Sequence, residues 1–233
     1  MSGKIYLIPV TLGGLDYEYV VPDKVLYLTR SLRSFVTEDI RSARRYLRLI
    51  DKTFPIDESV FFELNEHTPD TEVMSLLDVV KKGTDTGLMS EAGLPGIADP
   101  GAVLIRKAHE LNIRVIPLSG PSSVILALIA SGMNGQQFAF HGYLPVKNDE
   151  RVRKLKEIEK KIQNGVTQIF METPYRSQKM LDSILTVCQP DTKLCIAADI
   201  TLADEFIKTK RIKDWRKDIP DTRNRLVIFL IGT

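Results

Sequence analysis

Short apolar runs alternate with longer amphipathic stretches along almost the whole chain. Several runs are continuously apolar, as strands buried on both faces of a sheet are, and strand alternating with helix is typical of mostly parallel sheets covered by helices. The sequence therefore predicts the α/β fold class. The predicted strands are Ile5–Val10, Val25–Thr29, Val60–Leu64, Gly87–Met89, Arg114–Leu118, Phe138–Tyr143, Gln168–Glu172, Leu194–Ala198 and Leu226–Ile231, and the predicted helices are 37–50, 70–82, 101–111, 122–132, 149–164 and 176–187.

The length of 233 residues is near the most that one hydrophobic core supports, which favours two compact domains. The best boundary is the segment PLSGP at 117–121, where a strand leaves the first pattern and a new helix begins. We place the junction near residue 115. The prediction is an N-terminal α/β domain, 1–115, and a C-terminal α/β domain, 116–233.

The composition fits a folded, water-soluble protein, because 43% of residues are hydrophobic and 27% are charged. The longest apolar run, 124–130, is too short to span a bilayer, and no signal peptide opens the chain, so we expect a cytoplasmic protein that does not enter a membrane. Cys188 and Cys195 form no CxxC pair and the three histidines are isolated. We therefore predict free thiols and no metal site.

The formal net charge of +2 hides a strong asymmetry. Segments 30–52, 147–161 and 207–225 together carry +12, which leaves −10 on the remainder. This pattern suits a polyanionic partner, although solvated basic helix faces and loops explain it equally well. Two basic sets could follow phosphates: Arg41, Arg44, Arg45 and Arg48 at the spacing of one helix face, and Lys208, Lys210, Arg211 and Lys213.

The segment 90–101, SEAGLPGIADPG, follows a predicted strand and holds the densest group of turn-forming residues. Ligands bind at the carboxyl ends of strands in open α/β sheets, so this loop is a candidate ligand loop, with a rigid surface loop as the alternative. The serines of segment 119–123 could bond a ligand or cap the next helix. No GxxxxGK[ST] occurs, and no GxGxxG follows the first strand, so neither a P-loop nor an ordinary dinucleotide-binding domain is supported.

Six segments in order carry a resemblance to a known family: IPVTLGG at 8–14, TEDIR at 37–41, NEH at 65–67, SEAGLPGIADPG at 90–101, PLSGPSS at 117–123 and METPYR at 171–176. The chain resembles the tetrapyrrole methylase superfamily of S-adenosylmethionine-dependent methyltransferases. Within it, the chain is most similar to the branch that 2′-O-methylates a cytidine ribose in bacterial small-subunit ribosomal RNA. The resemblance implies two α/β domains with mostly parallel sheets, a homodimer, and S-adenosylmethionine bound between the domains.

The resemblance also implies which residues meet the cofactor. Asp99 matches a position near the cofactor's ribose and amino acid, and a carboxylate suits a ribose diol because it accepts two hydrogen bonds. Met171 matches a position over the adenine, where a methionine offers an adaptable apolar surface. The full implied set is Leu12, Gly13, Ile97, Asp99, Ala102, Ser122 and Ser123 from the loops of the first part of the chain and the junction, with Met171, Ala197 and Leu226 from the second part.

Methyl transfer is an in-line displacement, and a ribose hydroxyl would gain from a positioned base. The candidate catalytic residues are Glu38, Asp39, Arg41 and Glu172. The alternatives are helix N-terminal charge for Glu38 and Asp39, and a structural ion pair with Arg176 for Glu172.

Three functions remain open from the sequence. The first is methylation of RNA, with ribosomal RNA or the small ribosomal subunit as the partner. The second is methylation of a small tetrapyrrole-like molecule. The third is a relative that binds the cofactor or RNA without catalysis, because Leu12, Ile40 and Glu91 stand where the RNA-methylating pattern has proline, threonine and aspartate.

Overall fold

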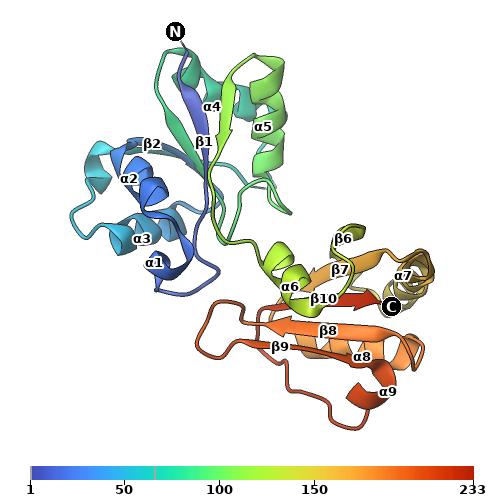
Figure 1. The fold of residues 1–233 in the computed structure, drawn as a ribbon. Coiled ribbons are helices and arrows are strands. Elements are labelled where there is room, and N and C mark those ends of the chain that lie inside the picture. Colours follow the sequence, from blue (N-terminus) through green and yellow to red (C-terminus); the bar gives the residue numbers. More distant parts are fainter. Residues whose placement is uncertain (1, 66) are drawn as a thin grey trace. The chain divides into compact units, whose positions relative to one another are not determined.

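A computed structural model describes residues 2–65 and 67–233, with the side chain of Asp70 left out. The chain divides into two compact units, Met1–Ser122 and Ser123–Thr233 (Figure 1). Each unit has its own five-stranded sheet. The predicted junction near residue 115 falls inside strand β5 (Arg114–Pro117), which pairs with β1 (Lys4–Ile8), so the whole of this strand stays with the first unit.

The first sheet has the order β3-β2-β4-β1-β5, and all its described pairings are parallel. The other strands are β2 (Ser34–Thr37), β3 (Val60–Glu63) and β4 (Thr86–Met89). Both faces are covered, because the neighbours Phe35 and Val36 on β2 point into two different hydrophobic cores. This two-sided burial explains why these strands lack polar alternation.

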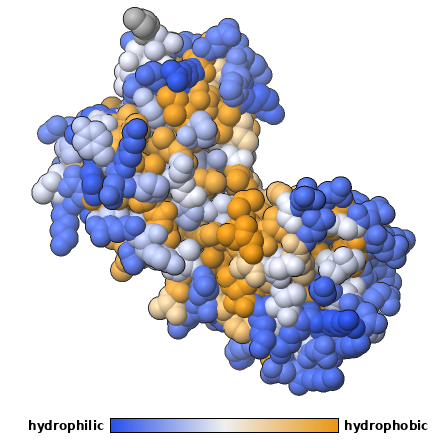
Figure 2. Space-filling model, viewed as in Figure 1, coloured by the Kyte–Doolittle hydropathy of each residue, from blue (hydrophilic) through white to orange (hydrophobic). Residues whose placement is uncertain are grey.

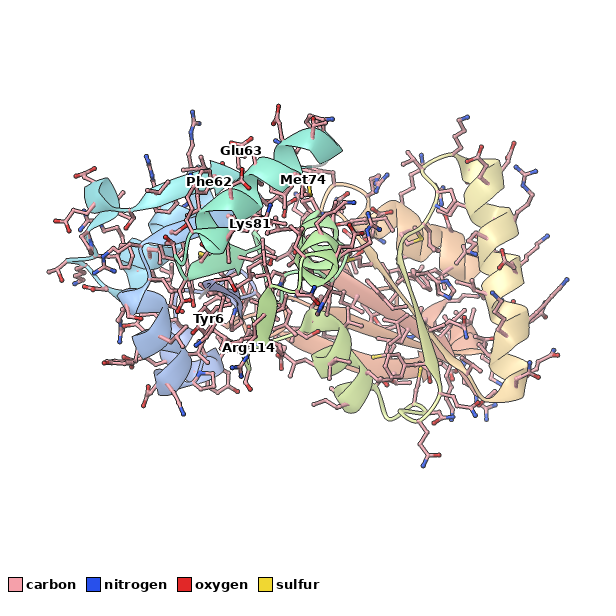
Figure 3. All side chains as sticks on the ribbon, turned by 90° about the horizontal axis from the view of Figure 1, so that it is seen from above. Tyr6, Phe62, Glu63, Met74, Lys81 and Arg114 are labelled. Carbon is pink, nitrogen blue, oxygen red and sulfur yellow. The ribbon has the colours of Figure 1, made fainter. Side chains whose placement is uncertain are left out.

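Two pairs of helices cover the two faces of the first sheet. Helices α2 (Asp23–Ser31) and α3 (Ile40–Ile50) contribute to the core around Phe35, and α4 (Asp70–Lys81) and α5 (Gly101–Glu110) to the core around Val36. Phe62 of β3 packs against this second core, and Figure 3 labels it near Met74 and Lys81 of α4. The short elements α1 (Tyr17–Val20) and η1 (Ile56–Glu58) complete the unit.

The predicted strand Val25–Thr29 is wrong, because these residues lie within α2. Pro22 stands at the helix N-cap with an extended backbone, and Asp23 supplies a negative charge to the first turn. Val25, Leu26 and Thr29 are buried at helical spacing. The predicted helix 37–50 begins later, at Ile40, because residues 34–37 form β2.

The second sheet has the order β6-β7-β10-β8-β9 and is mixed. Its strands are β6 (Phe138–Tyr143), β7 (Thr167–Glu172), β8 (Lys193–Ala198), β9 (Phe206–Arg211) and β10 (Val227–Gly232). Strands β6 and β7 are parallel, whereas the other three described pairings are antiparallel. Parallel pairings outnumber antiparallel ones in the described chain as a whole. In this unit the antiparallel strands β8 and β9 are joined by residues 199–205, a connection that needs no crossover helix.

The second core lies on one face of this sheet, where α7 (Asn148–Lys161), α8 (Ser177–Val187) and α9 (Ile212–Trp215) surround Phe170 and Phe229. The short helix η2 (Ile162–Asn164) extends α7. Helix α6 (Ser123–Ser131) packs against β8, β9 and β10. Cys188 and Cys195 are buried free thiols. Across residues 2–65 and 67–233, no helix combines the length and apolar character of a membrane span.

Candidate functional site

The loops that follow β1, β4 and β5 meet at Gly93. The amide of Val10 donates to the carbonyl of Gly93 at 2.9 Å, and the amide of Gly93 donates back to Thr11 at 3.4 Å. Gly93 has φ +71°, and a Cβ there would lie 3.1 Å from Leu12 Cδ2 and 3.3 Å from the carbonyl oxygen of Pro121. The residue type at 93 therefore allows the three loops to approach one another closely.

A second contact joins the first and third of these loops. A Cβ on Gly120 would lie 2.1 Å from Cβ of Pro9, so only glycine lets the two backbones pack at this distance. Gly13 in the first loop is exposed and has φ +107°, a backbone conformation that favours glycine. The loops are held by their own backbones, which makes this edge of the sheet a preformed surface.

The sheet order places these loops where α/β proteins bind ligands. The neighbours β2 and β4 send the chain in opposite directions, β2 to β3 at one edge and β4 to β5 at the other. Such a divergence leaves a crevice at the carboxyl ends of the strands. The loop after β2 carries Glu38 and Asp39, and the loop after β4 carries Asp99.

Asp99 has one oxygen in use and one without a partner. Its Oδ1 accepts from the amides of Gly96 at 2.9 Å and Gly101 at 2.7 Å, which fixes the loop and the start of α5. Its Oδ2 is buried with no hydrogen-bond partner in the described part of the chain, and burial raises the pKa of this carboxyl group. A buried acceptor costs free energy unless it is bonded, so Oδ2 fits a ligand's N–H or O–H group.

Thr37 carries the other unpartnered atom of this kind, since its buried Oγ1 finds no partner among the described residues. The residue ends β2 and pairs with Met89 at the end of β4. Thr37 was not among the predicted site residues. Both unpartnered atoms thus belong to the carboxyl edge of the first sheet, one at a strand end and one in the loop that follows β4.

The remaining predicted cofactor residues of the first unit lie on the same loops. Leu12 and Ser122 are buried, while Gly13, Ala102 and Ile97 are exposed, Ile97 to 44%. Ser123 opens α6 and so belongs to the second unit. Glu66, in the predicted NEH segment, is outside the described residues.

In the second unit, strand register brings the three predicted apolar residues onto one face. Ile228 of β10 pairs with Met171 on β7 and with Ala197 on β8, so these side chains form a row across the sheet. Leu226 precedes Ile228 by two residues and points to the same side, with 47% of its surface exposed. Glu172, next to Met171, points to the opposite face.

Glu172 forms the ion pair with Arg176 that the sequence left as an alternative. The distance from Arg176 Nη2 to Glu172 Oε1 is 2.5 Å, and only 3% of the glutamate side chain is exposed. The same oxygen accepts from the amide of Thr173 at 2.8 Å. These contacts hold the turn that follows β7.

Glu172→Gln is therefore expected to lower the free energy of unfolding by about 1–3 kcal/mol, because a buried charged hydrogen bond is weakened. The predicted methyl-transfer activity of the folded protein should stay within about threefold of the original, since Glu172 faces away from Met171. Urea denaturation and methyl-transfer kinetics measure the two effects. A large loss of turnover with unchanged stability would instead make Glu172 catalytic.

Asp39 caps α3. Its carboxylate accepts from the amides of Ser42 at 2.8 Å and Arg41 at 3.3 Å, and the Ser42 hydrogen bonds lower the pKa of this group. Asp39 therefore has the structural role that the sequence offered as the alternative to catalysis, because its negative charge lies at the N-terminus of α3 and caps it. Glu38 is half-buried and Arg41 is exposed. The three candidates Glu38, Asp39 and Arg41 lie together because β2 ends at Thr37 and α3 begins at Ile40.

The two basic sets differ in their surroundings. Arg41, Arg44, Arg45 and Arg48 are all exposed on the side of α3 opposite its buried residues. Arg44 lies with Cζ 5.0 Å from the centre of the Phe61 ring. In the second unit, Lys208 is exposed, but Lys210 pairs with Asp218, and Arg211 and Lys213 both pair with Asp191. The arginine face of α3 is the better phosphate surface.

No cluster of three or more metal-ligating side chains occurs in residues 2–65 and 67–233. The chemistry that the site offers rests on amides, hydroxyls, carboxylates and arginines.

Comparison with known proteins places this geometry in context. The sequence model of the family described as "Tetrapyrrole (Corrin/Porphyrin) Methylases" matches residues 21–215. A Vibrio cholerae protein named "Ribosomal RNA small subunit methyltransferase I" is 31% identical over 95% of this chain and 73% of its own length. A Haemophilus influenzae protein of the same name is 29% identical over 100% of this chain and 80% of its own length.

Solved structures share the fold at lower identity. The diphthine synthase structure has a TM-score of 0.68 at 14% identity and covers 100% of this chain and 90% of its own. The structure of the methyltransferase CobJ has a TM-score of 0.64 at 16% identity, with coverage of 100% and 95%. The predicted α/β fold of tetrapyrrole methylase type is confirmed.

Proposed function

The chain belongs to the tetrapyrrole methylase family of S-adenosylmethionine-dependent methyltransferases, and from this premise we propose that it methylates a ribose 2′-hydroxyl of small-subunit ribosomal RNA. The similarity to ribosomal RNA methyltransferases extends over nearly the whole chain, which supports RNA as the acceptor class. The exposed arginine face of α3 supports the same acceptor, because phosphates bind such a face.

S-adenosylmethionine is the proposed cofactor, and it supplies the methyl group. The unpartnered Oδ2 of Asp99 is the observation that carries this assignment, since it offers a hydroxyl or amino group of the cofactor a buried acceptor. We assign the loop residues Leu12, Gly13, Ile97 and Ala102, with Ser122 and Ser123, to the same ligand. Met171, Ala197 and Leu226 are proposed to offer the adenine an apolar surface.

The protein's part in the reaction is to hold donor and acceptor in line. We propose that Glu38, Asp39 and Arg41 contact the acceptor at the end of β2. Arg41 would bind a phosphate, and a carboxylate of this cluster would receive the proton that the hydroxyl loses. Glu38 and Asp39 are both candidates for this role, and Asp39 would receive the proton while it caps α3.

A homodimer in the cytoplasm is the proposed working form. Helix α6 is apolar around its circumference, and Ile129 on it is 71% exposed. Figure 2 shows hydrophobic residues gathered over the region of α6. Such a helix suits a partner surface, and light scattering of the purified protein measures whether two copies associate.

The deciding experiment is transfer of labelled methyl from S-adenosylmethionine to small ribosomal subunits and total RNA from cells that lack the gene. Mass analysis of the nucleosides should find a 2′-O-methylated product. Labelling of a tetrapyrrole precursor with none of RNA would make the chain a small-molecule methylase. Cofactor binding without transfer to either acceptor would identify a non-catalytic relative.

A further inference from the structure

Tyr175 is the most exposed of the large hydrophobic side chains in the described chain, at 90%. It lies in the turn between β7 and α8, four residues after Met171. Single exposed aromatic residues are common and need no explanation by themselves. The surroundings of Tyr175 set it apart, because its backbone is fixed on both sides.

The turn itself is closed by hydrogen bonds. The amide of Arg176 donates to the carbonyl of Thr173 at 3.0 Å, and Arg176 Nε donates to Thr173 Oγ1 at 3.3 Å. Pro174 restricts the backbone directly before Tyr175. The Glu172–Arg176 ion pair closes the base of the turn.

A second segment braces the turn from outside. The amide of Asn224 donates to the carbonyl of Pro174 at 3.1 Å. Ser177 Oγ donates to the carbonyls of Pro174 and Thr222. The amide of Thr222 in turn donates to Gln178 Oε1 at 2.8 Å. Residues 222–224 thus hold the turn against the start of α8, and the tyrosine ring projects from a rigid base.

Three arginines of the segments that form and brace the turn have carboxylate partners. Arg176 pairs with Glu172, Arg223 with Asp221 at 2.6 Å, and Arg225 Nε with Asp199 at 2.6 Å. The turn therefore presents an exposed aromatic ring next to arginines that are already engaged with carboxylates. This chemistry suits the flat face of a ligand better than a phosphate.

The location links the ring to the proposed reaction. Residues 173–177 follow the end of β7, two residues after Met171, and residues 221–225 precede Leu226, the residue before β10. Both segments that brace Tyr175 thus adjoin the apolar row proposed for the adenine. A base held by Tyr175 would lie beside the residues assigned to the methyl donor.

We propose that Tyr175 is a stacking platform for an unpaired nucleobase of the RNA acceptor. RNA-binding proteins recognise single strands by stacking splayed bases on aromatic side chains, and an aromatic ring carried on a fixed backbone loses less entropy when it does so. The proposal rests on the proposed function, because it takes RNA as the acceptor. Tyr175 is a positioning residue here and takes no part in bond making.

The test compares Tyr175→Ala and Tyr175→Phe with Tyr27→Ala. Tyr27 is 76% exposed on α2 and serves as the matched control. One readout is the Kd for a fluorescent single-stranded oligouridine across a salt series. The other is KM and kcat for small ribosomal subunits from cells that lack the gene.

Tyr175→Ala is expected to weaken oligouridine binding about five- to hundredfold, the range for one lost base–aromatic stack. The slope of log Kd against log salt should not change, because no phosphate contact is removed. KM should rise with little change in kcat, and Tyr175→Phe and Tyr27→Ala should behave like the original protein.

Three results would overturn the proposal: unchanged oligouridine binding by Tyr175→Ala, an equal loss in Tyr175→Phe, or a reduced salt slope, which would indicate a phosphate contact. The proposed function fails separately, if the original protein methylates no RNA. The binding measurement does not depend on turnover, so it decides the role of Tyr175 in either case.

Discussion

Asp99→Asn is expected to weaken S-adenosylmethionine binding about ten- to hundredfold, the effect of losing one hydrogen bond to a charged group. Asparagine keeps one oxygen, which can still accept from the amides of Gly96 and Gly101. It replaces the unpartnered Oδ2 by an NH₂ group, which donates and cannot accept. The loop should therefore stay in place while the ligand's donor loses its partner.

Calorimetry measures the affinity, and thermal unfolding without cofactor measures the stability. We expect the free energy of unfolding to change by less than about 1 kcal/mol. Asp51→Asn is the matched control, because Asp51 also accepts two hydrogen bonds from nearby groups, the Thr53 amide and hydroxyl, away from the ligand loops. Cofactor binding by Asp99→Asn at the original affinity would remove Asp99 from the cofactor site.

The same carboxyl group predicts a pH dependence of cofactor binding. Burial raises the pKa of Asp99 above its ordinary value, so in the free protein it takes up a proton at a higher pH than an exposed aspartate does. The cofactor's donor needs the ionised form. Affinity should therefore fall as pH drops through this pKa. Binding should release up to one proton at pH values near and below this pKa and none well above it, and Asp99→Asn should lack this dependence. Calorimetry in buffers of different ionisation enthalpy measures the released proton.

The first sheet is largely predictable from the sequence, because its central strands β1 and β4 are buried and read as apolar runs. β2 was missed because Ser34–Thr37 is short and lies directly before the TEDIR segment, whose charges suggested a helix start. Val25–Thr29 was assigned to a strand since five residues rich in apolar and aromatic side chains fit either structure. Pro22 and Asp23 were the local signal that favours a helix.

β9 illustrates a different limit. Its sequence, FIKTKR, is rich in basic residues, and we interpreted the segment only as a charged surface. An edge strand is where lysines are expected in a sheet, because they discourage pairing with other chains. The basic residues are thus compatible with an edge strand, but they do not predict one. The strand is defined by its pairing with β8, which the sequence of β9 alone does not show.

The candidate site divides in the same way. Glycine and proline spacing indicated the ligand loops, since those residues are needed for tight turns. Sequence could not indicate that Asp99 keeps one oxygen without a partner, because this depends on where the amides of Gly96 and Gly101 lie. Met171, Ala197 and Leu226 share one face of the sheet because of the register of β10 with β7 and with β8. These strands are far apart in the sequence, so their register cannot be predicted from it.

Replacing Arg41, Arg44, Arg45 and Arg48 together by glutamine is expected to give the largest loss of RNA binding. Each phosphate contact on a single strand contributes about −0.7 to the slope of log K against log salt, so four lost contacts should reduce the slope by about 3. At 0.1 M salt the same release of counterions lowers the association constant for RNA by about 0.7 of a decade per lost contact. Four lost contacts together should therefore weaken RNA binding by close to a thousandfold.

The fold should tolerate this change, because the four side chains lie on the exposed side of α3. The losses within the protein include the contact of Arg44 with the Phe61 ring, the hydrogen bond from Arg45 to Ser42 Oγ at 3.4 Å and the hydrogen bond from Arg48 to the carbonyl of Lys52 at 2.7 Å. Circular dichroism and cofactor affinity check that the variant remains folded. Titration of RNA over a salt series gives the slope.

The matched control replaces Lys210, Arg211 and Lys213 by glutamine. These cations already pair with Asp218 and Asp191, so an RNA phosphate would have to compete with those carboxylates. Their removal should change the slope by less than about 1. An unchanged slope in the α3 variant, or an equal change in the control, would contradict a phosphate surface on α3. The slope also separates the two proposed RNA contacts, since arginines that bind phosphates change it and a tyrosine that stacks on a base does not.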